Sequence, residues 1–387
     1  MEDNYCILLG NALRTSGNLL ILSFLSGFMQ YNRVILYYFS GTGNARASAY
    51  WFAEVAHERN IDCEVIQLYR KTEVNPECIA DEKKLFGFFF PTHGFNAAPA
   101  MLKFIWHFPR MKNTAVLLVN TRAGMKVSKL FAPGLSGLAQ ILPAIILIVK
   151  GFTVVGMQPM DLPSNWISIH PGLKEKVAES IFKRCERITK QFANRILDGG
   201  TKYKALISIP IDLAIIPISV GYYCFGRFFL AKTFISTKDC NGCAICETQC
   251  PVGAISMKQG RPFWSFNCES CMKCMNNCPT KAIQTAHLYN FILWYLILAI
   301  IPSLGFWVLF EKQCLELIEN EWLASNLLSV ILYTISLPAV ALAYRVLHFA
   351  TRWKWIDDFD KYTSLTSYWF WRRYKYGLKL FRKEGVK

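Results

Sequence analysis

Eight of the fourteen cysteines stand in two short runs with identical spacing. In each run three cysteines follow one another as C-x2-C-x2-C, and after three more residues comes a fourth cysteine that directly precedes a proline. The runs are Cys240, Cys243, Cys246 and Cys250, before Pro251, and Cys268, Cys271, Cys274 and Cys278, before Pro279. Three thiolates at this spacing wrap around one iron–sulfur cube, whereas the fourth opens a helix and reaches the other cube. The spacing therefore predicts two [4Fe–4S] clusters.

The same crossing rule assigns ligands to each cluster. We expect cluster 1 to be held by Cys240, Cys243, Cys246 and Cys278, and cluster 2 by Cys268, Cys271, Cys274 and Cys250. A zinc site is the alternative, but zinc takes four ligands, typically as two C-x2-C pairs, and does not need this repeated pattern. Because iron-bound thiolates need a reducing compartment, we expect the clusters to lie in the cytoplasm.

A second motif with chemical potential follows the apolar segment 34–39 (VILYYF). It consists of Ser40, Gly41, Thr42, Gly43 and Asn44. Two glycines allow a tight turn in which successive backbone N–H groups point inward, and the following helix adds its positive dipole end. The chain has neither GxxxxGK[ST] nor GxGxxG, so the loop favours a monophosphate. The alternative is a glycine-rich turn without a ligand.

The elements around this loop alternate between apolar strands and helices. Strands are predicted at 34–39, 63–68, 85–90, 114–120 and 152–156, and helices at 45–58, 98–107, 134–149 and 173–197. Such alternation predicts a doubly wound parallel α/β sheet, which binds ligands beyond the carboxyl ends of its strands. Two further loops lie at that edge, one at 91–96 and one at 120–124.

The segment FSGTGN resembles the phosphate loop of flavodoxins, whose usual form is [ST]-x-T-G-N-T, with Ala45 in place of the last Thr. The resemblance implies a flavodoxin-like domain with FMN, whose phosphate is held by the loop from Ser40 to Asn44. It also implies that the isoalloxazine ring lies between the other two loops. Their candidate residues are Thr92, His93, Gly94 and Phe95, and Asn120, Thr121, Arg122 and Gly124. Phe95 is the candidate for stacking, since Arg122 replaces the usual aromatic residue.

Two uncharged windows follow the cysteine runs, Leu288–Phe310 and Trp322–Tyr344. Each has 23 residues, enough to cross a bilayer as a helix, so we expect a transmembrane helical hairpin. Tyr289, Trp322 and Tyr344 are expected near the lipid boundary. The alternative is a buried helical hairpin in a soluble protein.

Charge gives the expected orientation of the hairpin. The loop 311–321 carries −3 and the tail 349–387 carries +6. The positive-inside tendency then places the redox domains and the tail on the cytoplasmic side of the cytoplasmic membrane. The basic, aromatic tail is suited to contact with lipid headgroups. The net charge of +16 would also suit a nucleic acid, but the chain carries no fold signature of a nucleic-acid-binding protein, so we expect no nucleic-acid partner.

We therefore divide the chain into six parts. They are an extension or early start (1–28), a flavodoxin-like FMN domain (29–200), an apolar and interfacial linker (201–231), a small α+β domain with two clusters (232–287), two transmembrane helices (288–344) and a basic aromatic tail (345–387). This combination resembles the EFR1-type ferredoxin family, in which a flavodoxin-like domain is fused to a bacterial 2[4Fe–4S] ferredoxin domain. The resemblance implies a redox function but no particular substrate.

Three functional hypotheses follow. The first is a membrane-anchored electron-transfer protein that links FMN to two clusters and passes electrons to a quinone or to a soluble redox partner protein. The second is an oxidoreductase with its own small substrate, bound over the flavin near His93 and Phe95. The third is a non-enzymatic membrane-bound sensor of redox or iron–sulfur status. No residue is assigned a catalytic role from the sequence.

Overall fold

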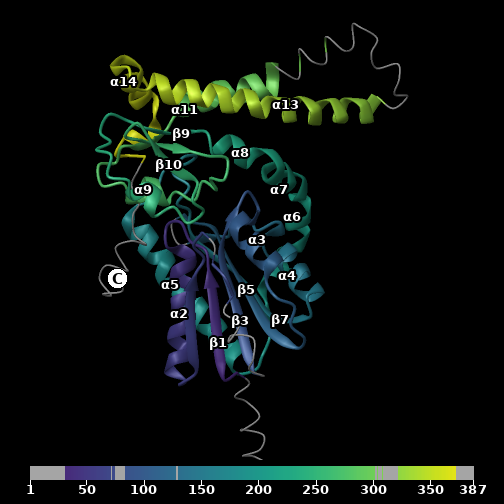
Figure 1. The fold of residues 1–387 in the computed structure, drawn as a ribbon. Helices are drawn as coiled ribbons and strands as arrows, with labels where there is room; N and C mark the ends of the chain where they lie inside the picture. The colour runs from purple at the N-terminus through teal and green to yellow at the C-terminus, as the bar shows by residue number, and fades with distance from the viewer. Residues whose placement is uncertain are drawn as a thin grey trace, which may run out of the picture.

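The computed structural model describes residues 31–70, 72–74, 83–127, 130–300, 303, 307 and 321–371. A sheet flanked by helices lies below a small cysteine-rich domain, and long helices run across the top of that domain (Figure 1). The expected extension 1–28, most of the loop 311–321 and the end of the tail lie outside the described residues.

The large sheet is parallel along its main path and has the order β2-β1-β3-β5-β7-β8. These strands are β1 (Arg33–Tyr38), β2 (Asp62–Gln67), β3 (Lys84–His93), β5 (Thr114–Val127), β7 (Phe152–Pro163) and β8 (Lys202–Tyr203). Short antiparallel partners, β4 (Asn96–Ala97) and β6 (Leu130–Ala132), pair with β3 and β5. The first five strands of the path have the flavodoxin-like order. The strand β8, which extends the sheet, was not predicted from the sequence.

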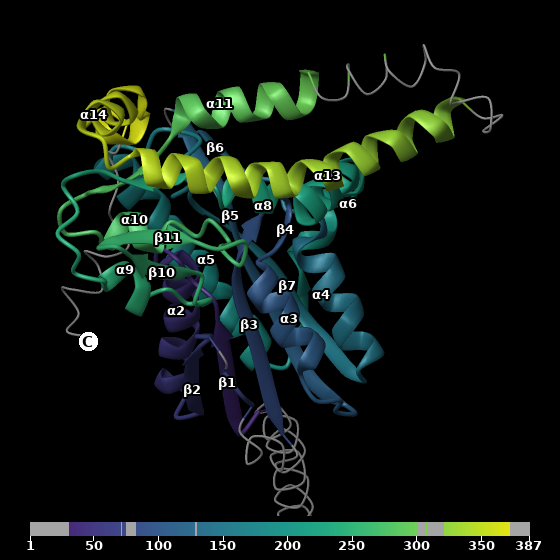
Figure 2. The same ribbon diagram turned by 45° about the horizontal axis from the view of Figure 1, so that its top comes forward.

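Helices cover both faces of the sheet (Figures 1 and 2). On one face lie α2 (Asn44–Glu58) and α5 (Glu175–Leu197), and on the other α3 (Pro99–His107) and α4 (Leu138–Val149). The sequence predicted all four helices. However, α4 begins four residues later than expected, because Gly137 has a positive φ of 55° that an α-helix does not accommodate.

The cysteine-rich domain, residues 232–287, is a small α+β unit on the carboxyl edge of the sheet. It contains two antiparallel pairs, β9 with β12 and β10 with β11, and two one-turn helices, α9 and α10. The bounds are β9 (Phe234–Ser236), α9 (Ile245–Thr248), β10 (Ile255–Lys258), β11 (Arg261–Trp264), α10 (Lys273–Asn277) and β12 (Ile283–Thr285). Its small core is centred on the fully buried Trp264.

The linker between the two domains consists of short helices along the side of the sheet domain. They are η2 (Lys204–Ser208), α6 (Ile209–Ala214), α7 (Ile216–Gly221), η3 (Tyr222–Gly226) and α8 (Arg227–Leu230). The path bends by 79° between Ala214 and Ile216. The buried carboxylate of Asp212 accepts hydrogen bonds from the backbone N–H groups of Ser136 and Gly137, at 3.2 and 2.7 Å. Asp212 thus holds the linker onto the loop before α4.

The C-terminal helices run side by side above the cysteine-rich domain (Figures 1 and 2). They are α11 (His287–Tyr295), continued by η4 (Leu296–Ile300), and α13 (Glu321–Ala350). In the described part of the chain, the segment Asn326–Ala350 is long and apolar enough to cross a membrane, and the bent linker pair 204–230 would be a second candidate if it formed one span. The first expected span, Leu288–Phe310, lies partly outside the described residues.

One end of α13 packs on protein. Val340 and Tyr344 are buried, and the Tyr344 hydroxyl donates to the carbonyl oxygen of Phe234 at 3.0 Å. It also accepts from the backbone N–H of Trp264 at 3.5 Å. The expectation that Tyr344 lies at a lipid boundary is therefore wrong, because its ring and hydroxyl complete the core of the cysteine-rich domain.

The first part of the tail also folds back onto this domain. It contains α14 (Lys354–Thr363) and η5 (Leu365–Ser367). Asp357 pairs with Arg261 at 3.2 Å, and Lys361 pairs with Asp239 at 2.8 Å. The indole N–H of Trp371 donates to the carbonyl oxygen of Ile167 at 2.6 Å. Residues 351–371 thus bind the cysteine-rich domain and the loop after β7.

Candidate functional site

The expected phosphate loop turns tightly between β1 and α2. Gly43 has a positive φ of 102°, and its backbone N–H donates to the Ser40 hydroxyl at 3.0 Å. The Asn44 amide donates to the carbonyl oxygen of Pro163 at 2.7 Å, and the Thr42 hydroxyl accepts from the Asn165 amide at 2.6 Å. Residues at and just after the end of β7 therefore hold the loop in place. The first turn of α2 directs its backbone N–H groups towards the carboxyl edge of the sheet, where the loop lies.

The other two predicted loops partly converge at this edge. The Asn120 amide donates to the Thr92 hydroxyl at 2.8 Å, and its carbonyl oxygen accepts from Gln140 at 2.6 Å. Arg122 pairs through its Nε with the Asp161 carboxylate at 2.7 Å. It also donates to the Ser136 hydroxyl at 3.3 Å, and this hydroxyl accepts from the Asn120 amide as well. Thr121 is buried, and a Cβ on Gly124 would lie 2.1 Å from the Asp161 carbonyl oxygen, so this stretch of β5 packs tightly on β7.

The cysteine-rich domain and the linker cover the carboxyl edge of the sheet. A Cβ on Gly41 would lie 2.0 Å from the backbone carbonyl oxygen of Cys271. A Cβ on Gly94, whose φ is 53°, would lie 2.0 Å from the ring of Tyr222. The phosphate loop therefore touches the second cysteine run directly, and both contacts require a residue without a side chain.

A buried acid–base pair lies at the same junction. The Nδ1 of His93 and the Oε2 of Glu269 are 3.9 Å apart, too far for a hydrogen bond. Burial lowers the pKa of His93 to about 4 and raises the pKa of Glu269 to about 8. Both groups are therefore neutral at pH 7, since the histidine lacks its extra proton and the glutamic acid keeps its own.

Several polar atoms at this junction have no hydrogen-bond partner among the described residues. They include His93 Nδ1, Glu269 Oε2, Ser270 Oγ and Trp166 Nε1. Buried polar atoms are usually paired, so unpaired ones that gather in one place indicate a missing polar group. A flavin mononucleotide, with a phosphate, ribityl hydroxyls and a ring edge rich in donors and acceptors, fits this set together with the phosphate loop.

The eight cysteines fall into two groups that match the predicted crossing. Cys240, Cys243, Cys246 and Cys278 together line a cavity of about 20 Å³. Burial raises the pKa of the Cys274 thiol, and the neighbouring thiols of Cys268, Cys271 and Cys250 raise it further. The fourth cysteine of each run thus belongs to the group of the other run.

The spacing of the thiols differs from that of a zinc site. Thiolates on one zinc ion, with Zn–S bonds of about 2.3 Å, lie roughly 3.8 Å apart. In the described part of the chain no three side chains of His, Cys, Asp or Glu come close enough together to hold one metal ion. Burial raises the pKa of Cys271 to about 12 and that of Cys246 to about 11, so iron would have to displace their protons.

A buried lysine lies beside the second cysteine group. The ammonium of Lys232 is 4.4 Å from the ring centre of Phe266 and 4.7 Å from that of Tyr344, and it donates to the Trp264 carbonyl oxygen. Burial lowers its pKa to about 8, while the nearby Cys268 opposes this shift. Lys232 therefore brings a positive charge close to the place predicted for a cluster.

Sequence reasoning missed several residues at the junction. Asn165 lies two residues beyond β7, at the edge where ligand-binding loops occur, but the strand was predicted to end at 156, so this position was not recognised. The sequence shows no comparable signal for Tyr222, Lys232 or Glu269. Their positions depend on how the linker and the second cysteine run pack against the sheet, which no local pattern encodes.

Comparison with known protein families supports the iron–sulfur assignment of the cysteine-rich domain. Residues 239–283 match a family model described as a 4Fe-4S dicluster domain. No curated protein matches the chain. Among solved structures, a flavodoxin from the Archaea is 19% identical with a TM-score of 0.27, and the match covers 42% of this chain and 98% of the flavodoxin.

Two further structures are similar to the same part of the chain. General stress protein 14 of Treponema denticola, solved in complex with FMN, is 11% identical with a TM-score of 0.27, over 42% of this chain and 98% of its own. The Flv1 flavodiiron core of Synechocystis is 18% identical with a TM-score of 0.26, over 44% of this chain and 37% of its own. The sheet itself has the flavodoxin-like strand order, and the cysteine-rich domain that follows it matches a 4Fe-4S dicluster domain.

Proposed function

We propose that this protein is a membrane-anchored electron carrier that holds FMN and two [4Fe–4S] clusters, as in the EFR1-type ferredoxin family. The observation that carries the proposal is the contact between Gly41 and Cys271. It brings the predicted phosphate loop of one redox domain against the predicted cluster loop of the other. FMN accepts electrons singly or in pairs and each cluster accepts one, so together the cofactors would link two-electron and one-electron chemistry.

The residues of the chain have separate tasks in this proposal. The loop Ser40–Asn44 would bind the phosphate, with Asn165 fixing the Thr42 hydroxyl. Tyr222 supplies an aromatic ring beside Gly94, at the loop where the flavin ring was expected to find a stacking partner. The cysteine-rich domain excludes water from this edge, since His93 and Glu269 are both almost wholly buried.

This covered edge favours an electron carrier over an enzyme with a small substrate above His93 and Phe95. Tyr222 occupies the space next to Gly94, and Glu269 lies beside His93. A substrate would have to displace both side chains. Electrons can instead cross between the domains where their chains are in contact.

The membrane anchor is part of the same proposal. From Glu321 to the point where Val340 becomes buried, α13 is helical over a length of roughly 28 Å, close to the ~30 Å hydrocarbon core of a bilayer. Exposed apolar side chains, among them Leu327, Ile331 and Ile335, lie along this stretch. The charge difference between loop and tail supports a cytoplasmic position for the redox domains.

Cofactor analysis of the full chain, purified anaerobically from membranes, tests this proposal. We expect about eight iron atoms and about one heat-released FMN per chain, and resistance of the membrane-bound protein to carbonate extraction. A colourless, zinc-containing protein would contradict the redox assignment. Release into the carbonate supernatant with both cofactors retained would contradict the anchor alone.

A further inference from the structure

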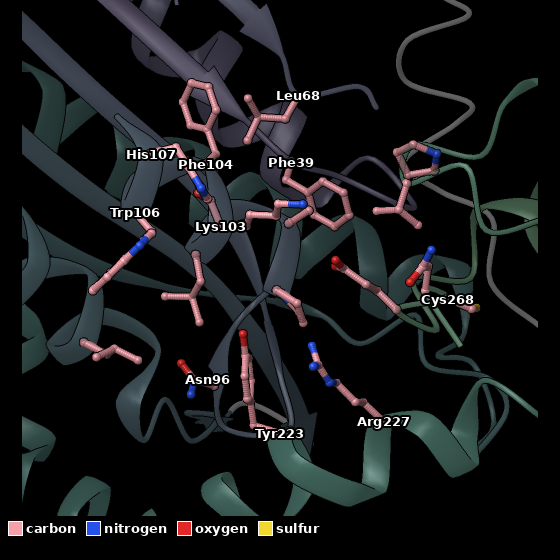
Figure 3. Close-up of a pocket in the computed structure, with 18 of the residues that line it drawn as sticks. Phe39, Leu68, Asn96, Lys103, Phe104, Trp106, His107, Tyr223, Arg227 and Cys268 are labelled. Atoms are coloured by element: carbon pink, nitrogen blue, oxygen red, sulfur yellow. The ribbon is translucent and has the colours of Figure 1, made fainter. Parts of the chain in front are cut away.

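A cavity of about 950 Å³ lies beside the second cysteine run, on the α3 and α4 face of the sheet domain (Figure 3). Its walls include the helices α3 and α4, the linker from Val220 to Phe228, and the cysteine-rich domain at Pro251–Val252 and from Phe266 to Glu269. The segments just after β1 and β2 also contribute to the lining, with Phe39 and Leu68 among their residues. The phosphate loop does not contribute to its lining. The cavity therefore adjoins the predicted FMN site without including its phosphate loop, and it shares Glu269 with the junction described above. Its volume is in the range of pockets for cofactor-sized molecules.

The charged groups of the cavity are mostly cationic, and Glu269, close to Arg227, is its acidic residue. Lys103 and Arg227 reach towards the same space from α3 and from α8 (Figure 3). The Arg227 guanidinium stacks over the Tyr223 ring at 4.3 Å, and its Nε has no hydrogen-bond partner among the described residues. Two long donors without acceptors of their own can bind carbonyl oxygens or stabilise a negative charge that develops on a ligand.

The remaining walls are aromatic or aliphatic. Phe39, Phe104 and Phe266 offer flat apolar surfaces, and Cys268 lines the same space. A planar ring held between these side chains would lie directly beside a predicted ligand of cluster 2. This position suits a molecule that exchanges electrons with that cluster.

The cavity opens onto an apolar surface. Trp106 and Val220 line it and are 65% and 47% exposed. Nearby elements add further exposed apolar residues, Ile145 and Ile148 on α4 and Ile218 on α7. The linker also connects this surface to the membrane helices, since Phe229 of α8 packs with Leu293 of α11 and Val340 of α13. A water-soluble ligand would not need such an entrance, whereas a lipid-soluble one would.

We propose that this cavity binds a lipid-soluble quinone, which enters from the membrane along the linker helices. The ring lies between the aromatic walls, its carbonyl oxygens accept hydrogen bonds from Lys103 and Arg227, and its apolar tail leaves past Trp106 and Val220. Reduction to the quinol takes two electrons, delivered singly from the reduced clusters, and two protons from water at the open edge. This inference rests on the proposed electron-transfer function and names its acceptor.

Quinone binding to the full-length protein in lipid nanodiscs tests the inference. The probe is a menaquinone with a short isoprenoid tail, titrated by quenching of protein fluorescence, and NADH is titrated in parallel. The variant Ala100→Phe places a ring in the cavity from the start of α3 and should weaken quinone binding about tenfold or more. The variant Lys103→Gln removes the positive charge and shortens the reach of one donor. The matched control Lys112→Gln makes the same change at an exposed lysine outside the cavity lining.

The outcomes separate this inference from the proposed function. Weaker quinone binding in Lys103→Gln but not in Lys112→Gln, with unchanged iron content, supports the inference, and it does so even if Ala100→Phe fails to fold. The inference is overturned if all variants bind quinone with the same affinity as the wild type. It is also overturned if the protein binds no quinone but binds NADH saturably, and Lys103→Gln weakens that NADH binding. Because binding is measured without turnover, loss of iron or FMN in the wild-type protein would contradict only the proposed function.

Discussion

Gly41 and Cys271 are in backbone contact across the boundary between the sheet domain and the cysteine-rich domain, and a single added methyl group would overlap the Cys271 carbonyl oxygen. The added carbon atom would lie 2.0 Å from that oxygen, so the two loops could not keep this contact with any residue larger than glycine at position 41. The contact joins the two loops whose sequence motifs predict different cofactors, so it provides the most direct test of whether they work together.

The variant Gly41→Ala should separate the two loops. Because the new Cβ would lie 2.0 Å from a backbone oxygen, one loop must move, and we expect a loss of about 1–3 kcal/mol in stability. Electron exchange between flavin and clusters should slow as well, measured by rapid-mixing absorbance. Gly221→Ala is the control, since a Cβ at that helical position meets nothing within 4 Å. Equal behaviour of the two variants would show that the contact is unimportant.

The ligand crossing can be tested with the fourth cysteine of each run. We expect Cys250→Ser to disturb the cluster of the second run and Cys278→Ser that of the first, each leaving about four iron atoms per chain. Iron analysis and EPR of the reduced proteins check this, with Cys224→Ser, an exposed cysteine outside both runs, as control. If each variant lost the cluster of its own run, the crossing would be wrong.

Tyr344 should be essential for docking of α13. In Tyr344→Phe the Phe234 carbonyl oxygen loses its donor, which costs about 1–2 kcal/mol, and Tyr344→Ala should cost about 3–5 kcal/mol. Thermal unfolding in detergent, followed by loss of cluster absorbance, measures both. Leu327→Ala, on an exposed part of the same helix, should leave this transition unchanged.

A pH dependence is expected from Asp360 in α14. Burial, reinforced by the charge of Asp357, raises the pKa of Asp360 to about 6. A carboxyl group with a raised pKa stabilises the fold fully only below its unfolded value of about 4, and this stability is lost as the pH rises through about 6. The stability difference between Asp360→Asn and the wild type should therefore grow in favour of the variant between about pH 4 and pH 6 and level off above pH 6.

Thermal unfolding of both proteins across that range measures the effect of Asp360. The control is Asp358→Asn, which removes an exposed carboxylate paired with Lys238 and should give a small difference that does not vary over the same range. A constant difference between Asp360→Asn and the wild type would contradict the raised pKa.

Much of the sheet domain could be predicted from sequence because its signals are local. The apolar run before Ser40 and the later runs of the same kind became β1, β2, β3, β5 and β7. The cysteine spacing is likewise a local signal, since a short loop allows few arrangements of thiols around a cube. Both signals depend on residues close in sequence.

The covering of the carboxyl edge could not be predicted, because its contacts join residues far apart in sequence. Tyr222 meets Gly94, and Glu269 meets His93, across more than a hundred residues. Arg122 was expected near a flavin, yet Asp161 binds it from the neighbouring strand. The apolar pattern around Tyr344 is expected both at a lipid boundary and in a protein core. Only the hydrogen bonds of its hydroxyl with the backbone of Phe234 and Trp264 distinguish the two.

The place of Tyr344 also has a consequence for how the protein is made. Because the core of the cysteine-rich domain includes a side chain some sixty residues beyond its last cysteine, that core remains open until α13 has been synthesised. Under the proposed membrane anchoring, insertion of the apolar helices and closure of the iron-binding domain would then be linked steps. The cell could load iron into a chain already attached to the bilayer, so that unanchored protein does not consume clusters.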